Sequence, residues 1–338
     1  MTAGKRGASA RGDDDDLLSG VRNGAWLDEQ SFPPLRYVIP GIVPEGLTVL
    51  AGAPKVGKSW IVLSWLLAVA SETGRTLGNI ALPGARPVFY LALEDGDRRM
   101  QDRCEVILAG GATPPTYEYL TEVAPGRLPD TVAAWLALHP DGMVVIDTLG
   151  KANSPALRGE TTYDRDYRVM SELKSIVDRY PGAALIVNHH DRKASTADFV
   201  EAVSGTNAIT GSADTVIVLQ RDRNQSDGLL NVTGRDVDER AFALQFDAGV
   251  WVLEGGSLKI SLSAAKERAA ETGVGPRSRE VIAFVRRYPQ GVRPPEVALG
   301  LGIDVTAATT YLGRLFSEGR LARPERGLYA PALCLLCC

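Results

Sequence analysis

Residues 46–65 read GLTVLAGAPKVGKSWIVLSW: an apolar strand-like run, a break that contains glycine and proline, and a second apolar run. Further along the chain, strand-like apolar runs keep alternating with helical patterns, through VFYLALE, MVVIDTLG and AALIVNHH to ADTVIVLQ. Strands that are apolar throughout and alternate with helices are typical of a parallel sheet covered on both faces. We therefore expect an α/β fold with a mostly parallel sheet sandwiched by helices.

The break itself has the pattern G-x-x-x-x-G-K-S, placed after a strand and at the start of a helix. Glycines allow successive backbone N–H groups to turn toward a β-phosphate, and the helix N-terminus adds its positive dipole end. In such a loop the lysine contacts the β- and γ-phosphates, and the hydroxyl binds Mg²⁺. We expect ATP and Mg²⁺ as cofactors. The predicted nucleotide-binding residues are Gly52, Ala53, Pro54, Lys55, Val56, Gly57, Lys58 and Ser59.

Carboxylates at the ends of two other strand-like runs complete this prediction. Asp147 ends MVVID and is the expected second metal ligand beside Ser59, although a strand-end aspartate can also simply cap a loop. Many ATPases place a glutamate directly after this aspartate, but here Thr148 follows. Glu94 ends another strand at the same sheet edge and is the predicted general base. The alternative is a helix N-cap acid, a role that Asp95 fits better.

Two further polar groups are candidates for a role in hydrolysis. His189 and His190 end the run AALIVNHH and could contact the γ-phosphate, or be surface histidines at a strand end. Arg235 follows a strand in NVTGRD and could stabilise phosphoryl charge across a subunit boundary. An internal ion pair with Asp236 or Asp238 is the alternative.

The composition is that of an ordinary globular protein, with 45% hydrophobic and 23% charged residues in 338. The longest apolar run, residues 60–70, is shorter than the roughly 20 residues that cross a bilayer, and the first residues lack the apolar stretch of a secretion signal. We expect a cytoplasmic protein with no membrane partner. The net charge of −4 equals the four aspartates at 13–16, so charge neither demands nor excludes nucleic acid. Four cysteines, three of them in the terminal CLLCC, form no disulfide framework.

Two regions after the parallel core have other patterns. The runs LLNVTGRD, FALQFD and GVWVLEG are short and closely spaced, which favours antiparallel strands that extend one sheet edge. Three short helical patterns and a hairpin then follow in the order of a winged helix-turn-helix. Residues 277–330 hold nine arginines, no lysine and five acidic residues, a net charge of +4. The predicted segments are a disordered leader over 1–30, the α/β core over 31–255, a linker over 256–276, the winged-helix-like domain over 277–331 and a tail over 332–338.

Taken in order, GAPKVGKS, VFYLALED, VVIDT, LIVNHH and VTGRDVDERAFALQFD resemble the RecA-like P-loop ATPases, most closely the RepA-type hexameric replicative helicase ATPases of plasmids and phages. The resemblance covers about residues 35–255. It implies that Glu94 is the base, that His189 or His190 senses the γ-phosphate, and that Arg235 reaches a neighbouring subunit. It also implies a hexameric ring that carries single-stranded DNA on loops matching 150–166 and 191–210. Independently of the resemblance, residues 191–214 form a long stretch rich in Ser, Thr and Gly, which could contact a polymer through Arg192 and Lys193 or be a disordered connector. The sequence departs from the DnaB-type pattern, since TGRD offers one arginine instead of a Lys-x-Arg pair.

These features predict a ring-forming, Mg²⁺-dependent ATPase that moves on or unwinds DNA. The expected partners are single-stranded or duplex DNA, further copies of the chain and replication proteins. A different class remains open: an ATP-switched DNA-binding regulator or adaptor that does not translocate. A small-molecule kinase is disfavoured, because no lid or acceptor-binding motif follows the phosphate loop.

Overall fold

The computed structural model describes residues 20–72, 74–152, 156–190, 207–222, 225–271 and 276–331. The chain divides into two compact units, residues 1–36 and 37–338. In the described part of the first unit, Asn23 caps helix α2 (Gly24–Asp28) by accepting a 2.8 Å hydrogen bond from the Trp26 backbone N–H. The segment expected to be a disordered leader thus contains a short capped helix, none of whose residues is buried. Residues 1–19 lie outside the described part.

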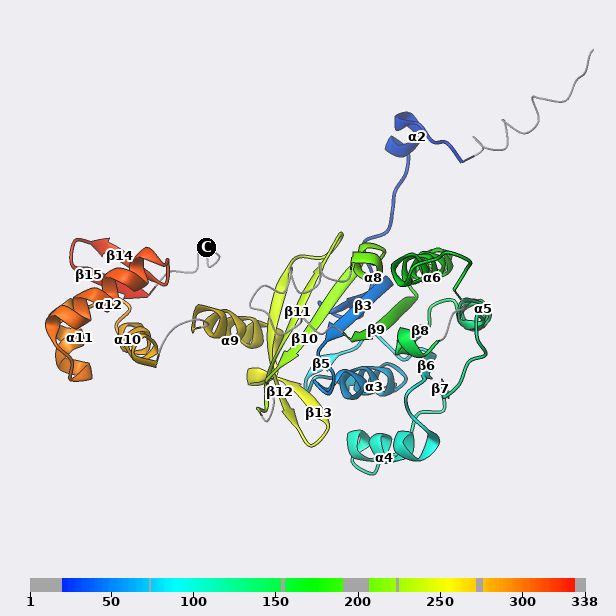
Figure 1. Cartoon of the computed structure of the whole chain (residues 1–338), viewed down its shortest axis with the longest axis horizontal. Helices are drawn as coiled ribbons and strands as arrows, with labels where there is room; N and C mark the ends of the chain where they lie inside the picture. The colour runs from blue at the N-terminus through cyan, green and yellow to red at the C-terminus, as the bar shows by residue number, and fades with distance from the viewer. Residues whose placement is uncertain are drawn as a thin grey trace, which may run out of the picture. The chain divides into compact units, whose positions relative to one another are not determined.

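A nine-stranded sheet forms the centre of the second unit (Figure 1), with the strand order β13-β12-β11-β10-β3-β9-β8-β6-β7. The strands from β10 to β7 in this order run parallel, and β11, β12 and β13 continue the sheet in antiparallel pairing. This confirms the predicted mostly parallel sheet. The bounds are β3 Gly46–Gly52, β6 Val88–Ala92, β7 Tyr117–Leu120, β8 Met143–Asp147, β9 Ala184–His190, β10 Thr215–Arg221, β11 Asp227–Gly234, β12 Arg240–Asp247 and β13 Val250–Leu253.

Helices cover both faces of this sheet (Figure 1), as the uniformly apolar strands predict. Apolar residues of α3 and α4 share one buried cluster with one face of the strands, and those of α5, α6 and α8 share a second cluster with the other face. The bounds are α3 Lys58–Val69, α4 Asp97–Leu108, α5 Leu128–Leu138, α6 Thr162–Val177 and α8 Asn207–Gly211. Two small antiparallel pairs complete this region, β1 (Tyr37–Ile39) with β2 (Val43–Pro44) and β4 (Arg75–Thr76) with β5 (Ile80–Ala81).

The segment expected to be a linker is mostly a helix, α9 (Leu258–Glu271). Ser261 donates a 2.7 Å hydrogen bond from its hydroxyl to the Ala243 carbonyl of β12. Arg268 donates to the Gly228 carbonyl of β11 at 3.0 Å and forms an ion pair with Glu254. Helix α9 is therefore packed against the antiparallel part of the sheet and belongs structurally to the core.

Residues 276–331 form three helices and a hairpin with a separate buried cluster. The elements are α10 (Pro276–Arg286), α11 (Pro294–Leu301), α12 (Val305–Ser317), β14 (Leu321–Glu325) and β15 (Leu328–Pro331). Val292 adds a β-bridge to Tyr329. This element order is the predicted one. Among the described residues, no helix has the length and apolar character needed to cross a membrane.

Candidate nucleotide site

The loop between β3 and α3 is closed tightly around two glycines. A Cβ on Gly52 would lie 2.6 Å from the Leu219 carbonyl oxygen of the adjacent strand β10. Gly57 has φ of 109°, and a Cβ there would meet the Trp251 ring nitrogen at 2.9 Å. Larger residues at either position would force the loop open. The glycines of the motif are therefore required by close approach to neighbouring strands as well as by backbone conformation.

Lys58 starts α3 and is only 4% exposed. Its ammonium group donates hydrogen bonds to the carbonyl oxygens of Gly52 at 2.7 Å and Ala53 at 3.1 Å. These two carbonyls thus hold the ammonium group within the loop. Phosphate oxygens bound there would accept the same hydrogen bonds in place of the carbonyls. This is the position that the sequence motif predicts.

An aromatic and cationic cluster behind the loop was missing from the predicted site. Trp251 of β13 is fully buried, and its ring N–H donates to the Gly57 carbonyl at 3.1 Å. The Arg221 guanidinium lies 4.3 Å from the Phe246 ring centroid and 5.6 Å from that of Trp251, and burial lowers the pKa of Arg221. Neither Trp251 nor Arg221 is among the candidate site residues predicted from the sequence. The signal that could have found this contact is the antiparallel pairing expected after β10, because such strands return to the end of the sheet where the phosphate loop lies.

Asp147 ends β8 and is 4% exposed. The hydroxyl of Tyr90, on the neighbouring strand β6, donates a 2.7 Å hydrogen bond to Asp147 Oδ2. Burial and then the nearby Asp147 charge raise the pKa of Tyr90 well above its ordinary value, so this hydroxyl remains a donor. The hydrogen bond fixes the carboxylate at the carboxyl end of the parallel strands.

Glu94 lies just beyond β6 and is exposed. The Thr148 hydroxyl donates to Glu94 Oε1 at 3.2 Å, so the residue that follows Asp147 holds the predicted base. Neither acid at this strand end caps a helix, because the N-cap of α4 is Gly96. The suggestion that Asp95 fits that role is wrong: Asp95 instead pairs with Arg99 at 2.9 Å and with Arg103.

His189 and His190 end β9, in register with Ala51 and Gly52 at the start of the phosphate loop. Arg235 lies on the opposite side of the sheet, where the parallel strands begin. It directly follows Gly234, which pairs with Thr215 at the start of β10.

The Arg235 guanidinium donates to the Gly211 carbonyl at 3.0 Å. Of the two aspartates named as alternative partners, Asp238 is paired with Arg240 at 2.7 Å. The structure thus groups Lys58, Asp147, Glu94 and the histidines at one sheet edge and separates Arg235 from them within a chain.

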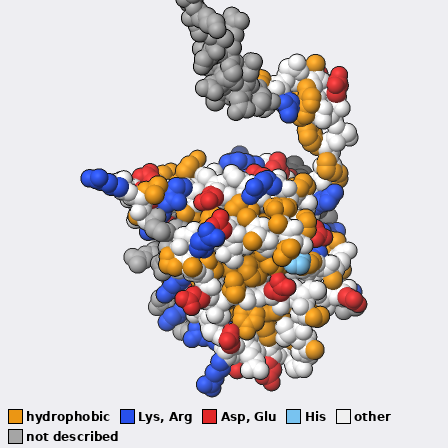
Figure 2. Space-filling view, turned by 90° about the vertical axis from the view of Figure 1, so that its right-hand side faces the viewer, with side chains coloured by type: hydrophobic (Ala, Val, Ile, Leu, Met, Phe, Trp, Pro, Cys, Tyr) orange, Lys and Arg blue, Asp and Glu red, His pale blue; other side chains and the backbone are white. Residues whose placement is uncertain are grey.

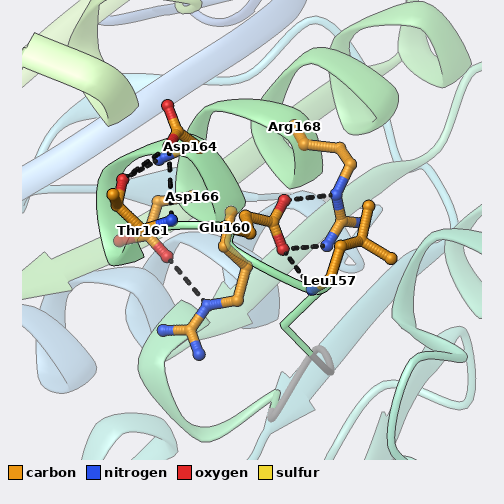
Figure 3. A network of polar contacts seen from close by, with 7 residues as sticks. Leu157, Glu160, Thr161, Asp164, Asp166 and Arg168 are labelled. Carbon is orange, nitrogen blue, oxygen red and sulfur yellow. Dashed lines mark hydrogen bonds and ion pairs between the residues drawn. The ribbon is translucent and has the colours of Figure 1, made fainter.

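The second half of the predicted DNA loop 150–166 is an ordered helix start (Figure 3). Glu160 accepts hydrogen bonds from Arg168 at 2.8 and 3.1 Å and from the Leu157 backbone at 2.7 Å. These contacts, Arg168 first, lower the pKa of Glu160 to about 2. Thr161 and Asp164 form a capping box at the start of α6. Residues 153–155, and residues 191–206 of the second predicted loop with Arg192 and Lys193, lie outside the described part.

The oxygen groups present fit a hydrated Mg²⁺ bound mainly through phosphates. Mg²⁺ in nucleotide sites uses one or two protein carboxylates, substrate phosphates and several waters. Asp147 supplies the carboxylate, and Ser59, next to Lys58 in the first turn of α3, supplies the hydroxyl. No group of three or more His, Cys, Asp or Glu side chains able to hold a metal occurs among the described residues. The donor set therefore matches a cation that arrives with a nucleotide.

Comparison with known proteins places the chain in a family. Among solved structures, it is similar to a DnaB-like replicative helicase studied with primase, at 12% identity over 72% of this chain and 67% of that chain, with a TM-score of 0.49. It is also similar to the RadB recombinase, at 13% identity over 63% and 92%, with a TM-score of 0.44. No curated protein matches the sequence. A family model described as AAA domain matches residues 21–196. Since that match spans more than half of the 338 residues and includes the phosphate loop and Asp147, it confirms the predicted P-loop ATPase class, and the chain belongs to the AAA domain family.

Proposed function

We propose that this protein is a Mg²⁺-dependent ATPase that acts on DNA as a ring-forming motor of the replicative helicase type. The observation that carries the proposal is the convergence of three groups at one sheet edge: the Lys58 ammonium inside the phosphate loop, the buried Asp147 carboxylate and the exposed Glu94 carboxylate. A cation, a metal-side acid and a base around a triphosphate are the parts that hydrolysis requires.

Each group has a separate task in this proposal. Lys58 and the loop N–H groups bind the β- and γ-phosphates, and Ser59 and Asp147 would hold Mg²⁺, which when bound neutralises phosphate charge. Glu94, aligned by Thr148, accepts a proton from the attacking water. His189 or His190 contacts the γ-phosphate.

A ring of copies is favoured by two features of the core. Arg235 lies across the sheet from its own phosphate loop, so a role in hydrolysis requires the site of another copy. The edge strand β7 exposes Tyr119 and Leu120, and Leu138 at the end of α5 is 76% exposed. Figure 2, which views the molecule from the right of Figure 1, shows apolar side chains over much of this face with charged groups between them. Apolar surface of this kind favours contact with another protein surface.

The first prediction concerns DNA. ATP hydrolysis should rise several-fold when single-stranded DNA is added, and the protein should separate a forked duplex when ATP is present, because a motor couples turnover to its track. Phosphate release measured with and without DNA checks the first part, and strand displacement the second. Stable duplex binding with slow hydrolysis that DNA does not change would favour the ATP-switched regulator instead. Absence of binding to any polynucleotide would contradict both.

The C-terminal residues 276–331 support an accessory role in DNA or partner binding. Three helices followed by a hairpin, with a β-bridge that joins Val292 after the first helix to Tyr329 of the hairpin, are the arrangement of a winged helix, and the net charge of residues 277–330 is +4. This domain is also the feature that keeps the regulator as a second candidate function.

Removal of residues 277–338 should leave basal ATPase activity within about twofold and weaken DNA binding, with a smaller salt dependence because fewer phosphates are neutralised. The cut retains α9, whose contacts with β11 and β12 belong to the core. Fluorescence anisotropy at two salt concentrations and phosphate release measure the two effects. Loss of all ATPase activity would show instead that the domain supports the core.

A further inference from the structure

Asn188 is an unusual residue for the centre of a sheet. It is fully buried in β9, and neither its amide nitrogen nor its amide oxygen makes a hydrogen bond within the described residues. A buried polar group without partners destabilises the fold, whereas an apolar side chain of similar size would not. One explanation for such a buried amide is that it binds an ion or a water in the functional state of the protein.

The strand register places Asn188 beside the predicted metal ligand. Asn188 pairs with Leu50 of β3, and the pairing of Val187 with Ile146 puts Asn188 next to Asp147 of β8. Neighbouring strands lie about 4.8 Å apart, so side chains of adjacent residues on one face are close.

Both side chains also point to the same face. Side chains alternate along a strand, and Ile186 and Val145, two residues before Asn188 and Asp147, belong to the cluster that packs against α3. Tyr90, the hydrogen-bond partner of Asp147, is in that cluster too. Helix α3 begins with Lys58 and Ser59 at this end of the sheet. Asn188 therefore lies on the face where phosphates and cation would be bound.

We propose that Asn188 is a further polar group of the metal and nucleotide site, which orients a water ligand of the bound cation. Mg²⁺ keeps several of its waters in such sites, and these waters need acceptors. The amide oxygen of Asn188 accepts from such a water, and the amide nitrogen donates to the oxygen of a second water beside it. An amide suits this position because it provides both functions without adding negative charge beside Asp147 and the phosphates.

This inference rests on the proposed nucleotide site, and binding can test it without turnover. A fluorescent, non-hydrolysable ATP analogue is titrated into the full chain, once in excess EDTA and once with Mg²⁺, and the ratio of the two Kd values gives the Mg²⁺ gain. Asn188→Leu should keep the parent Kd in EDTA within about twofold and lose about tenfold of the Mg²⁺ gain, as is usual when a group behind a metal ligand is removed.

Thr48→Val is the matched control. Thr48 is fully buried on the same face of β3, its hydroxyl also has no hydrogen-bond partner within the described residues, and it lies two residues before Leu50, toward the other end of the strand. Its substitution should leave the Mg²⁺ gain at the parent value. The Tm of nucleotide-free Asn188→Leu should equal or exceed that of the parent, because an unsatisfied amide has been removed. If the Tm falls by several degrees instead, Asn188→Ala, which cannot overpack, is used for the same titrations.

The outcomes separate the two proposals. A parent chain that binds the analogue in neither buffer contradicts the proposed function. A parent that shows a Mg²⁺ gain, with Asn188→Leu or Asn188→Ala retaining it in full, overturns the role of Asn188 alone. An equal loss in Thr48→Val would also overturn it, since the effect would then follow from any change in the sheet.

Discussion

Lys58→Ala should reduce ATP hydrolysis by about a thousandfold, because one preorganised donor to developing charge in a buried site contributes about this much. Lys58 is 4% exposed, and its ammonium group already lies inside the loop, 2.7 Å from the Gly52 carbonyl oxygen. In the variant, no cation replaces it at the β- and γ-phosphates, and the two loop carbonyls lose their donor as well. Nucleotide binding by anisotropy and phosphate release under saturating ATP measure the two consequences.

Lys259→Ala is the control for this change. Lys259 is exposed on α9, so its removal makes the same change in net charge without touching the loop. It should hydrolyse ATP at the parent rate. Full ATPase activity in Lys58→Ala would contradict the phosphate-loop assignment, whereas equal losses in both variants would point to an effect of net charge.

The parts of the site that could be predicted from the sequence are those fixed by local pattern and by one rule of topology. The strand, loop and helix around Gly52 and Lys58 are contiguous in sequence. Asp147 and Glu94 end apolar strands, and parallel strands with helical crossovers bring such ends to one edge. The antiparallel extension after β10 could likewise be predicted, because its strands are short, alternating runs in the sequence.

The contacts that hold these groups could not be predicted in the same way. Tyr90 with Asp147, Thr148 with Glu94 and Trp251 with Gly57 each join residues from segments far apart in the sequence. Such pairs depend on strand order and register, which a single sequence does not specify.

Local propensity also misled at two places. Helix α4 follows Glu94 and Asp95, yet Gly96 is its N-cap, because Asp95 is engaged by two arginines one and two turns along the helix. The segment 256–276 is rich in small and polar residues and suggests a linker, but the packing of Ser261 and Arg268 on the sheet stabilises a long helix there. Local ion pairs in the first case, and contacts with the sheet in the second, outweigh the expected preference.

Glu94→Gln should bind ATP with nearly the parent affinity and lower turnover by about a hundredfold to ten-thousandfold, the contribution of a positioned general base. Glutamine keeps the shape of the side chain and can still accept the hydrogen bond from Thr148, so the geometry of the site is preserved while the base is lost. Anisotropy with an ATP analogue and single-turnover phosphate release separate binding from chemistry. Glu105→Gln, an exposed glutamate on α4, is the matched control and should keep parent turnover. Unchanged turnover in Glu94→Gln would assign the base to another residue.

The same variant tests whether a site is completed by a second copy. Arg235→Ala should be inactive alone if Arg235 acts in the neighbouring site, since no subunit then supplies the arginine. In a mixture with Glu94→Gln, some interfaces combine an intact Glu94 from one copy with an intact Arg235 from the other, so part of the ATPase activity should return. Because Arg235 lies at the sheet edge opposite its own Glu94, no such recovery is expected from a role within one chain. Activity in Arg235→Ala equal to that of the parent, or a mixture no more active than either variant, would favour a purely structural role for its hydrogen bond to Gly211.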